Sequence, residues 1–183
     1  PLFTGGFSLS AYVHGVDLAA NFTYSYGNKV YNANKVDFST IRGAAGQNVV
    51  ETMSPDNRWT NVDWESGEFI TDLDQLARVN AGKTMWAPYA TRRICQSWAL
   101  EDASYLRLSN LTIGYTFPEK LTQKIKINKI RLYATGTNLF CLTPYTGYDP
   151  EVDTRTSTPL TPNVDYSAYP KSRGWVFGIN VSF

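Results

Sequence analysis

The sequence predicts an all-β protein of about five antiparallel, up-and-down strands. These would be the C-terminal strands of a large transmembrane β-barrel with two long extracellular loops. Five segments alternate apolar with polar residues, and the clearest are about ten residues long, as a tilted strand needs to cross a bilayer. The connections between them alternate between short and long, which is typical of outer-membrane barrels. No run approaches the 18 apolar residues of a membrane-spanning helix.

The first two predicted strands, 6–13 and 16–27, form an antiparallel hairpin, because the link between them is very short. The second strand places these apolar and aromatic residues on one face: Val16, Leu18, Ala20, Phe22, Tyr24 and Tyr26. We do not expect catalysis at His14 in the link, because no nucleophile or carboxylate constellation surrounds it.

The segment 28–104 shows no sustained period and is predicted to be a long extracellular loop. Connections of this length without regular structure are rare in soluble domains, whereas barrels carry them on the external side. A short helix is expected within 71–81, with Thr71 as its N-cap and Asp74 three residues later.

The third and fourth strands are predicted at 105–117 and 130–140. The apolar residues change parity near Ser109, which indicates a β-bulge or a change of environment there. The link 118–129 is basic. It is interpreted mainly as a solvated turn, with contact to anionic lipid head groups as the alternative.

A second extracellular loop is expected at 141–173, and the fifth strand at 174–183. Five strands do not close a bacterial barrel, and unpaired edges are not viable in lipid, so these strands must belong to a larger structure. The chain begins without the basic and apolar segments of a signal peptide. We therefore expect it to be an internal or C-terminal part of a longer precursor.

The charge and the cysteine content exclude several classes of function. A net charge of +1 gives no reason to expect a nucleic-acid partner. The two cysteines and one histidine match no metal-ligand spacing, so neither a metal nor a cofactor is expected. No catalytic constellation is apparent, so we do not expect an enzyme.

Four stretches in order resemble one protein family. The segment 104–118 reads SYLRLSNLTIGYTFP, 131–140 reads RLYATGTNLF, 145–152 reads YTGYDPEV, and 177–183 reads FGINVSF. The residues around Gly5-Gly6-Phe7 and 26–32 fit the hairpin that precedes them. Together they are similar to the C-terminal portion of the SusC/RagA-family TonB-dependent outer-membrane transporters of Bacteroidetes, whereas most of 33–100 is unmatched.

The resemblance implies a multi-pass protein of the bacterial outer membrane that imports oligosaccharides or peptides. Its implied partners are a SusD-like surface lipoprotein, TonB through an N-terminal part missing from this chain, and outer-membrane lipid. Two alternatives remain open. One is a TonB-dependent siderophore or cobalamin receptor, and the other is a soluble β-sandwich that binds carbohydrate.

Aromatic residues are the main candidates for functional sites. Those expected to contact substrate or partner are Trp59, Trp64, Trp86, Tyr89, Tyr145 and Tyr148. Further loop aromatics of the same kind are Trp98, Tyr166 and Tyr169. A purely structural role, as small cores of the loops, remains open for each of them. The resemblance implies that Phe183 is an assembly signal, and the alternative interpretation is an interfacial girdle aromatic.

Two further groups of loop residues call for an interpretation. Cys95 and Cys141 both fall on the expected extracellular side, where a disulfide between them is possible. Asp149, Glu151 and the nearby Asp153 do not follow the calcium-loop pattern. A turn stabilised by Asp149 ahead of Pro150 is the preferred interpretation.

Overall fold

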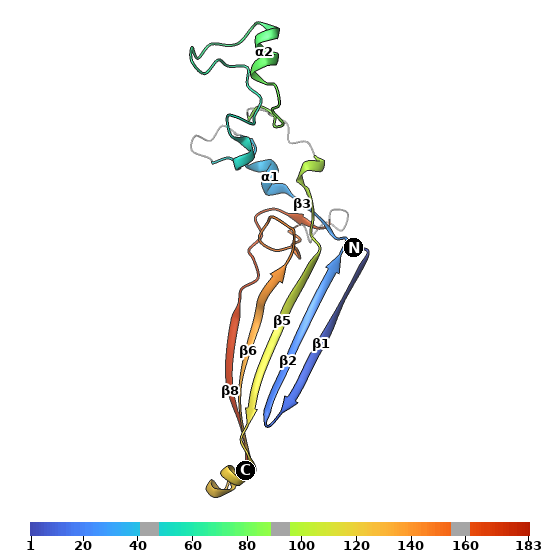
Figure 1. The fold of residues 1–183 in the computed structure, drawn as a ribbon, viewed down its shortest axis with the longest axis vertical. Helices are drawn as coiled ribbons and strands as arrows, with labels where there is room; N and C mark the ends of the chain where they lie inside the picture. Colours follow the sequence, from blue (N-terminus) through green and yellow to red (C-terminus); the bar gives the residue numbers. More distant parts are fainter. Residues whose placement is uncertain (41–47, 89–95, 155–161) are drawn as a thin grey trace. The chain divides into compact units, whose positions relative to one another are not determined.

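A five-stranded antiparallel sheet with the order β1-β2-β5-β6-β8 confirms the predicted fold class (Figure 1). Its strands are β1 Phe3–Val13, β2 Val16–Tyr26, β5 Tyr105–Thr116, β6 Lys129–Leu142 and β8 Gly174–Ser182. The computed structural model describes residues 1–40, 48–88, 96–154 and 162–183. Each strand pairs with the next one in chain order, which is the up-and-down arrangement.

The strand β1 begins three residues before the predicted start, because Phe3 already pairs with Tyr26. Gly5 and Gly6 hide this extension in the sequence, since glycine has no side chain and so carries no apolar or polar signal. The missing side chain at Gly5 also makes room for a ring. A Cβ atom there would lie 2.7 Å from the Tyr24 hydroxyl oxygen.

A two-residue turn of His14 and Gly15 joins β1 to β2. Both residues have positive φ, 49° and 88°, as the turns favoured in tight hairpins require. A Cβ atom on Gly15 would lie 2.7 Å from the backbone oxygen of Thr116, so a larger residue would be both strained and crowded.

The two faces of the large sheet differ in polarity. Because directly paired residues share a face, the register defines each face across the strands. The apolar face includes Phe7, Leu9, Leu18, Phe22, Leu111, Ile113, Leu132, Phe177 and Ile179. The polar face includes Ser8, Asp17, Asn21, Asn110, Thr112, Arg131, Thr135 and Asn180. Much of the apolar face is exposed, including 76% of Phe177 and 66% of Ile179.

A β-bulge at Ser109 confirms the predicted irregularity in β5. Asn21 of β2 pairs with Asn110, but the next residue, Phe22, pairs with Leu108. The unpaired Ser109 lies 2.9 Å from the Thr23 hydroxyl, measured between the two Oγ atoms. The extra residue reverses the alternation, so Leu108 lies on the same apolar face as the leucine and isoleucine further along β5.

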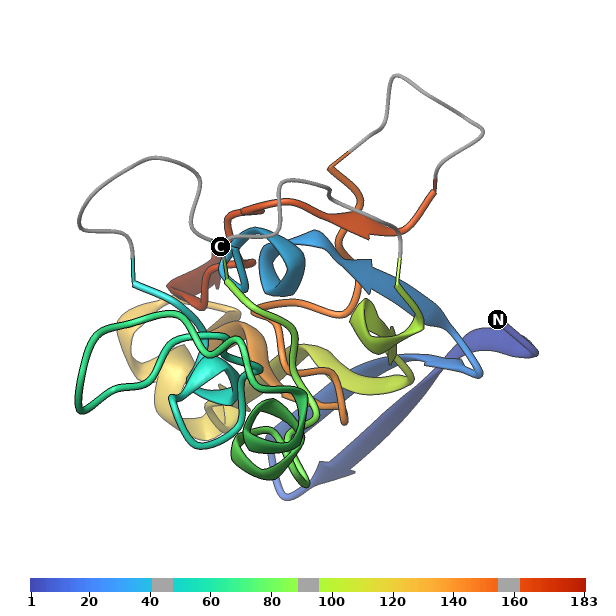
Figure 2. The same ribbon diagram turned by 90° about the horizontal axis from the view of Figure 1, so that it is seen from above.

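A small sheet with the order β4-β3-β7 gathers three short strands, and β3 and β7 run side by side in Figure 2. The strands are β3 Lys29–Asn32, β4 Leu100–Asp102 and β7 Val164–Asp165. Beside them lies a buried cluster of Val30, Ala103, Tyr145 and Val152, against which Ala168 packs. The segments predicted as loops therefore contain a core of their own.

The segment Asn32–Leu100 is a separate compact unit. It contains α1 Ala33–Asp37, α2 Leu73–Val79 and the 3-10 turns Glu51–Met53 and Ser97–Ala99. The helix predicted within 71–81 is present, but its cap was placed one residue too early. Asp72 rather than Thr71 caps α2, because its carboxylate accepts hydrogen bonds from the backbone N–H groups of Asp74 and Gln75.

The basic link between β5 and β6 folds into α3 Glu119–Thr122 and a following 3-10 turn, Gln123–Ile125. Among the described residues, no helix has both the length and the apolar character needed to span a membrane.

Candidate functional site

A buried arginine on the polar face of β5 anchors the β6–β8 loop. The Arg107 side chain is 7% exposed, and its Nη2 atom lies 2.6 Å from Oδ1 of Asp149, which is 10% exposed. Its Nε atom lies 2.7 Å from Oε2 of Glu151. Because Arg107 pairs with Thr23 and Cys141 on the polar face, these contacts hold the loop against that face.

Glu151 extends this cluster to two further residues. Its carboxylate accepts hydrogen bonds from the Tyr105 hydroxyl at 2.8 Å and from Lys171 Nζ at 2.6 Å. Burial raises the pKa of Glu151, but the hydrogen bonds from Lys171 and Tyr105, together with the charges of Lys171 and Arg107, outweigh it and leave the pKa below its ordinary value. We call Tyr105, Arg107, Asp149, Glu151 and Lys171 the loop clamp.

Asp149 also forms the turn that the sequence predicted. Its Oδ1 atom accepts a hydrogen bond from the backbone N–H of Glu151 at 2.9 Å, as an aspartate stabilising a turn two residues ahead does. In the loop clamp, the carboxylates of Asp149 and Glu151 form ion pairs with the protein's own Arg107 and Lys171. Among the described residues, no group of three or more metal-binding side chains is present.

Tyr145, one of the predicted contact residues, is buried in the small core beside β3. It is 6% exposed, and its hydroxyl donates to Oδ2 of Asp165 at 2.6 Å. Burial and this hydrogen bond to a carboxylate both raise the pKa of Tyr145. Tyr145 therefore packs inside the small core, and its contact with a substrate or partner stays a prediction. Tyr148, three residues on, is 80% exposed and available for contact.

Trp59 and Trp64 line a small groove of the separate unit with a volume of about 160 Å³, beside Arg58 and Pro88. Both indoles are exposed, 38% for Trp59 and 60% for Trp64. The Arg58 guanidinium carbon lies 5.4 Å from the centre of the Trp64 ring, within the range of a cation–π contact. An exposed indole pair beside a cation is suited to binding a ring or a polar chain.

Trp86 is placed differently from this pair. It packs edge-on against Trp98 with ring centroids 5.4 Å apart, and Lys35 Nζ lies 4.6 Å from the centre of the Trp98 ring. Both indoles are partly buried, which favours a structural role. Tyr89 lies outside the described residues, so its contact role remains a prediction.

The remaining predicted residues are scattered over the described part of the chain. Phe183 is 88% exposed next to the end of β8, and Tyr166 and Tyr169 are exposed in the β6–β8 loop. Cys141 lies in β6 and forms no disulfide with another described residue. Cys95 lies outside the described residues, so its pairing with Cys141 remains a prediction.

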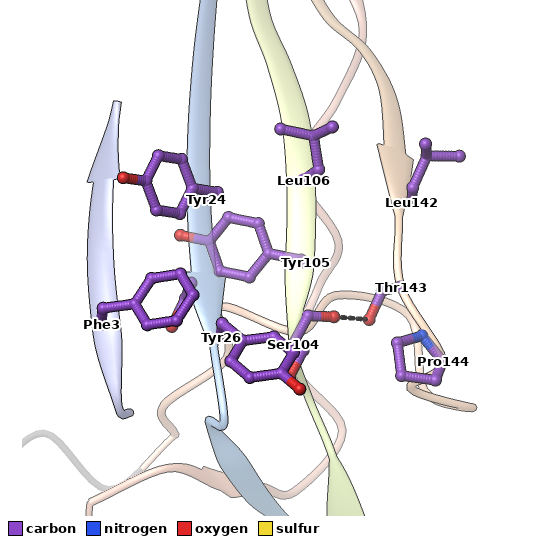
Figure 3. A pocket seen from close by; sticks show the side chains of 10 residues that line it. Phe3, Tyr24, Tyr26, Ser104, Tyr105, Leu106, Leu142, Thr143 and Pro144 are labelled. Atoms are coloured by element: carbon purple, nitrogen blue, oxygen red, sulfur yellow. Dashed lines mark hydrogen bonds between the residues drawn. The ribbon is translucent and has the colours of Figure 1, made fainter. Parts of the chain in front are cut away.

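An aromatic groove of about 460 Å³ lies at the end of the large sheet where the long loops begin (Figure 3). The Phe3 ring stacks on Tyr26 with centroids 5.1 Å apart and meets the edge of Tyr24 at 6.1 Å. Thr143 closes one side by donating a hydrogen bond to the backbone oxygen of Ser104 at 2.8 Å. Aromatic rings at the end of an apolar face are typical of a membrane–water interface.

A second ion pair crosses the polar face near the other end of the strands. Arg131 of β6 donates from Nε and Nη2 to the two carboxylate oxygens of Asp17 of β2, at 2.8 and 2.5 Å. The pair passes over β5 at Gly114, where a Cβ atom would lie 2.5 Å from both partners. A larger residue at position 114 would therefore have to displace the Arg131 and Asp17 side chains from this arrangement.

The sequence interpretation missed both ion pairs. A signal for them was present, because Asp17 and Arg131 occupy polar-face positions of otherwise alternating strands, where charges need partners. Arg107 and Asp149 lie in two of the stretches that carried the family resemblance, 42 residues apart. Their contact shows that these two stretches form one structural unit.

Comparisons with known proteins agree with this architecture. No family model matches the chain. TonB-dependent receptor P3 of Formosa agariphila is 29% identical over all of the chain, and TonB-dependent receptor P39 of the same organism is 32% identical over 99% of it. TonB-dependent receptor SusC of Bacteroides thetaiotaomicron is 34% identical over 46% of the chain.

A solved structure of the RagAB peptide transporter superposes on 98% of the chain with a TM-score of 0.70 and 30% identity. The chain spans 16% of the length of the two Formosa receptors and 17% of that transporter chain. The matched part is the C-terminal portion of the barrel.

Proposed function

We infer, because the chain belongs to the SusC/RagA family of TonB-dependent receptors, that its five strands cross the outer membrane of a bacterium as part of a closed β-barrel. The observation that carries this inference is the two-faced sheet. Its apolar face is continuous over five strands and widely exposed, as contact with lipid requires, while the opposite face is polar.

The same observation weighs against a soluble β-sandwich. A sandwich buries the apolar face of each sheet against the other. Here Leu9, Phe177 and Ile179 of that face are each more than half exposed. Bilayer lipid provides the cover that a second sheet provides in a sandwich.

We propose that the whole protein imports an oligosaccharide or a peptide together with a SusD-like surface lipoprotein, and that TonB drives the import through a part outside this chain. The named relatives are receptors and a transporter rather than enzymes. The solved relative carries peptides, which favours a peptide substrate, whereas the exposed indoles of Trp59 and Trp64 suit sugar rings equally well.

In this proposal the segments 28–104 and 141–173 lie outside the cell. The loop clamp then has a direct consequence, because the polar face of a closed barrel is its interior. In this proposal, the ion pair of Arg107 and Asp149 ties the first part of the second loop to the interior face of the barrel wall.

Membrane fractionation of the full-length protein tests this function. We expect it to stay with the outer membrane after salt and carbonate washes, and to copurify in mild detergent with a lipoprotein. Recovery in the aqueous fraction would favour the sandwich. Membrane association without any lipoprotein partner would favour the siderophore or cobalamin receptor.

A tryptophan substitution series tests the groove of Trp59 and Trp64 as the contact surface. We expect Trp59→Ala with Trp64→Ala to lower lipoprotein copurification or substrate uptake at least tenfold, because exposed aromatics often dominate binding energy. Trp98→Ala is the matched control, since this indole packs inside the same unit. If both variants reduce binding and unfold the unit equally, the groove has no special role.

A further inference from the structure

The link between β5 and β6 carries an amphipathic surface that the proposed transport function does not use. It is a folded unit rather than an open turn. Thr122 is buried, and its hydroxyl donates to the backbone oxygens of Glu119 at 3.2 Å and Asn128 at 3.4 Å. Backbone hydrogen bonds from Leu121 to Pro118 and from Ile127 to Thr122 complete this short connection.

Two apolar side chains of the link are exposed rather than packed inside it. Leu121 is 54% exposed and Ile125 is 60% exposed, although both side chains are pure hydrocarbon. They are four residues apart along consecutive helical turns and therefore lie on one side.

These two side chains form one wall of a groove of about 570 Å³. The other lining residues are Phe117, Thr122, Ile130, Leu132, Ile179 and Val181. Leu132 and Ile179 belong to the apolar face of the sheet. The groove is therefore continuous with the surface assigned to lipid, and almost all of its lining is hydrocarbon.

The charge of the link is one-sided. Its exposed lysines are Lys120, Lys124 and Lys126, with Lys129 following at the start of β6, and Glu119 is its single acidic residue. Across the described residues, none of these lysines lies within ion-pair distance of a carboxylate. Long basic side chains beside exposed apolar ones are the arrangement by which amphipathic segments bind a membrane interface containing anionic lipid.

We propose that this link binds an anionic phospholipid in the leaflet on the side of the short turns. One acyl chain occupies the groove beside Leu121 and Ile125, and the lysines contact the headgroup phosphate. The inference rests on the proposed membrane-spanning sheet. It assigns the link a lipid site that anchors the β5–β6 turn at the membrane surface.

Spin labels in the full-length protein, reconstituted in phosphatidylglycerol bilayers and free of other cysteines, test the placement. We expect a nitroxide at Ile125→Cys to collide with oxygen more often than with a water-soluble nickel chelate, as a label at Leu132→Cys does. A label at Gln123→Cys, an exposed polar position of the same link, should show the reverse.

The controls separate two kinds of failure. If the label at position 132 collides mainly with oxygen while the label at position 125 collides mainly with the nickel chelate, the proposed lipid site is wrong, and the membrane-spanning sheet is not contradicted. If both labels collide mainly with the nickel chelate, the proposal of a membrane-spanning sheet is itself wrong.

Lipid titration of the detergent-solubilised protein tests the chemistry. With native mass spectrometry as the readout, we expect phosphatidylglycerol to bind at least tenfold more tightly than phosphatidylcholine. The variant Lys120→Gln with Lys124→Gln and Lys126→Gln should lose that preference while still binding its lipoprotein. Equal binding of both lipids by the unaltered protein would overturn the proposed headgroup contact.

Discussion

Arg107 is a buried cation near the start of β5, and its contribution to stability depends on its acidic partners Asp149 and Glu151. Truncating it leaves the buried carboxylate of Asp149 without a counter-charge. Breaking a buried pair from one side typically costs about 3–5 kcal/mol, so we expect Arg107→Ala to lower the free energy of unfolding by that amount. Urea unfolding of the barrel, followed by tryptophan fluorescence, measures it.

A double variant provides the control for Arg107. With Arg107→Met and Asp149→Asn together, no charge is left buried and unpaired, so the loss should be smaller than for Arg107→Ala alone. A double variant at least as unstable as the single one would show that packing, rather than charge, explains the role of Arg107.

Glu151 makes the loop clamp sensitive to acid. Its pKa in the folded protein is lowered, so its stabilising contribution is complete above the ordinary glutamate pKa of about 4.3 and is lost as the pH falls through the lower, folded value. We expect hydrogen exchange in 141–154 to accelerate between about pH 5 and pH 3, beyond the intrinsic pH dependence of exchange. In Glu151→Gln this extra acceleration should disappear. If it persists, another group titrates in its place.

The strand β8 offers a matched pair of positions on opposite faces. Phe177 lies on the apolar face and Val176 on the polar face, and both side chains are more than half exposed. Arginine facing lipid near the bilayer midplane costs about 2–4 kcal/mol, whereas the barrel interior tolerates charge. Phe177→Arg should therefore reduce barrel stability and yield by far more than Val176→Arg. Equal effects in a heat-modifiability assay would contradict the assignment of faces.

Strand patterns predicted the elements well where alternation was unbroken, and less well where backbone features intervened. The parity change around Ser109 was visible in the sequence because a bulge leaves a mark in the alternation itself. The start of β1 was hidden by two glycines. The clamp between Arg107 and Asp149 was beyond reach, because no local pattern shows which loop residue folds back onto a strand.

The large sheet ends in two strands, β1 and β8, that each pair on one side within the described chain. Each needs a further partner strand, since open edges do not persist in lipid. The strand β8 ends beside Phe183, an exposed aromatic at its tip. This position suits both an assembly signal and an interfacial ring.

Deleting Phe183 distinguishes these two roles. If the residue is read during assembly, insertion of the full-length protein into the outer membrane should fall at least tenfold. Phe183→Tyr retains an aromatic ring and should insert normally. Unchanged insertion after deletion would leave Phe183 with the interfacial role alone. Outer-membrane yield, measured by immunoblot at equal synthesis, provides the readout.

The compact segment Asn32–Leu100 starts in β3 and ends in β4, and these two strands are neighbours in one small sheet. The chain therefore enters and leaves this segment through two hydrogen-bonded neighbouring strands. Such an insertion can be lengthened, shortened or exchanged for that of a relative without moving the strands that carry it. The fold thereby allows natural selection, or protein engineering, to change which molecules this segment contacts without altering the strands of the barrel wall.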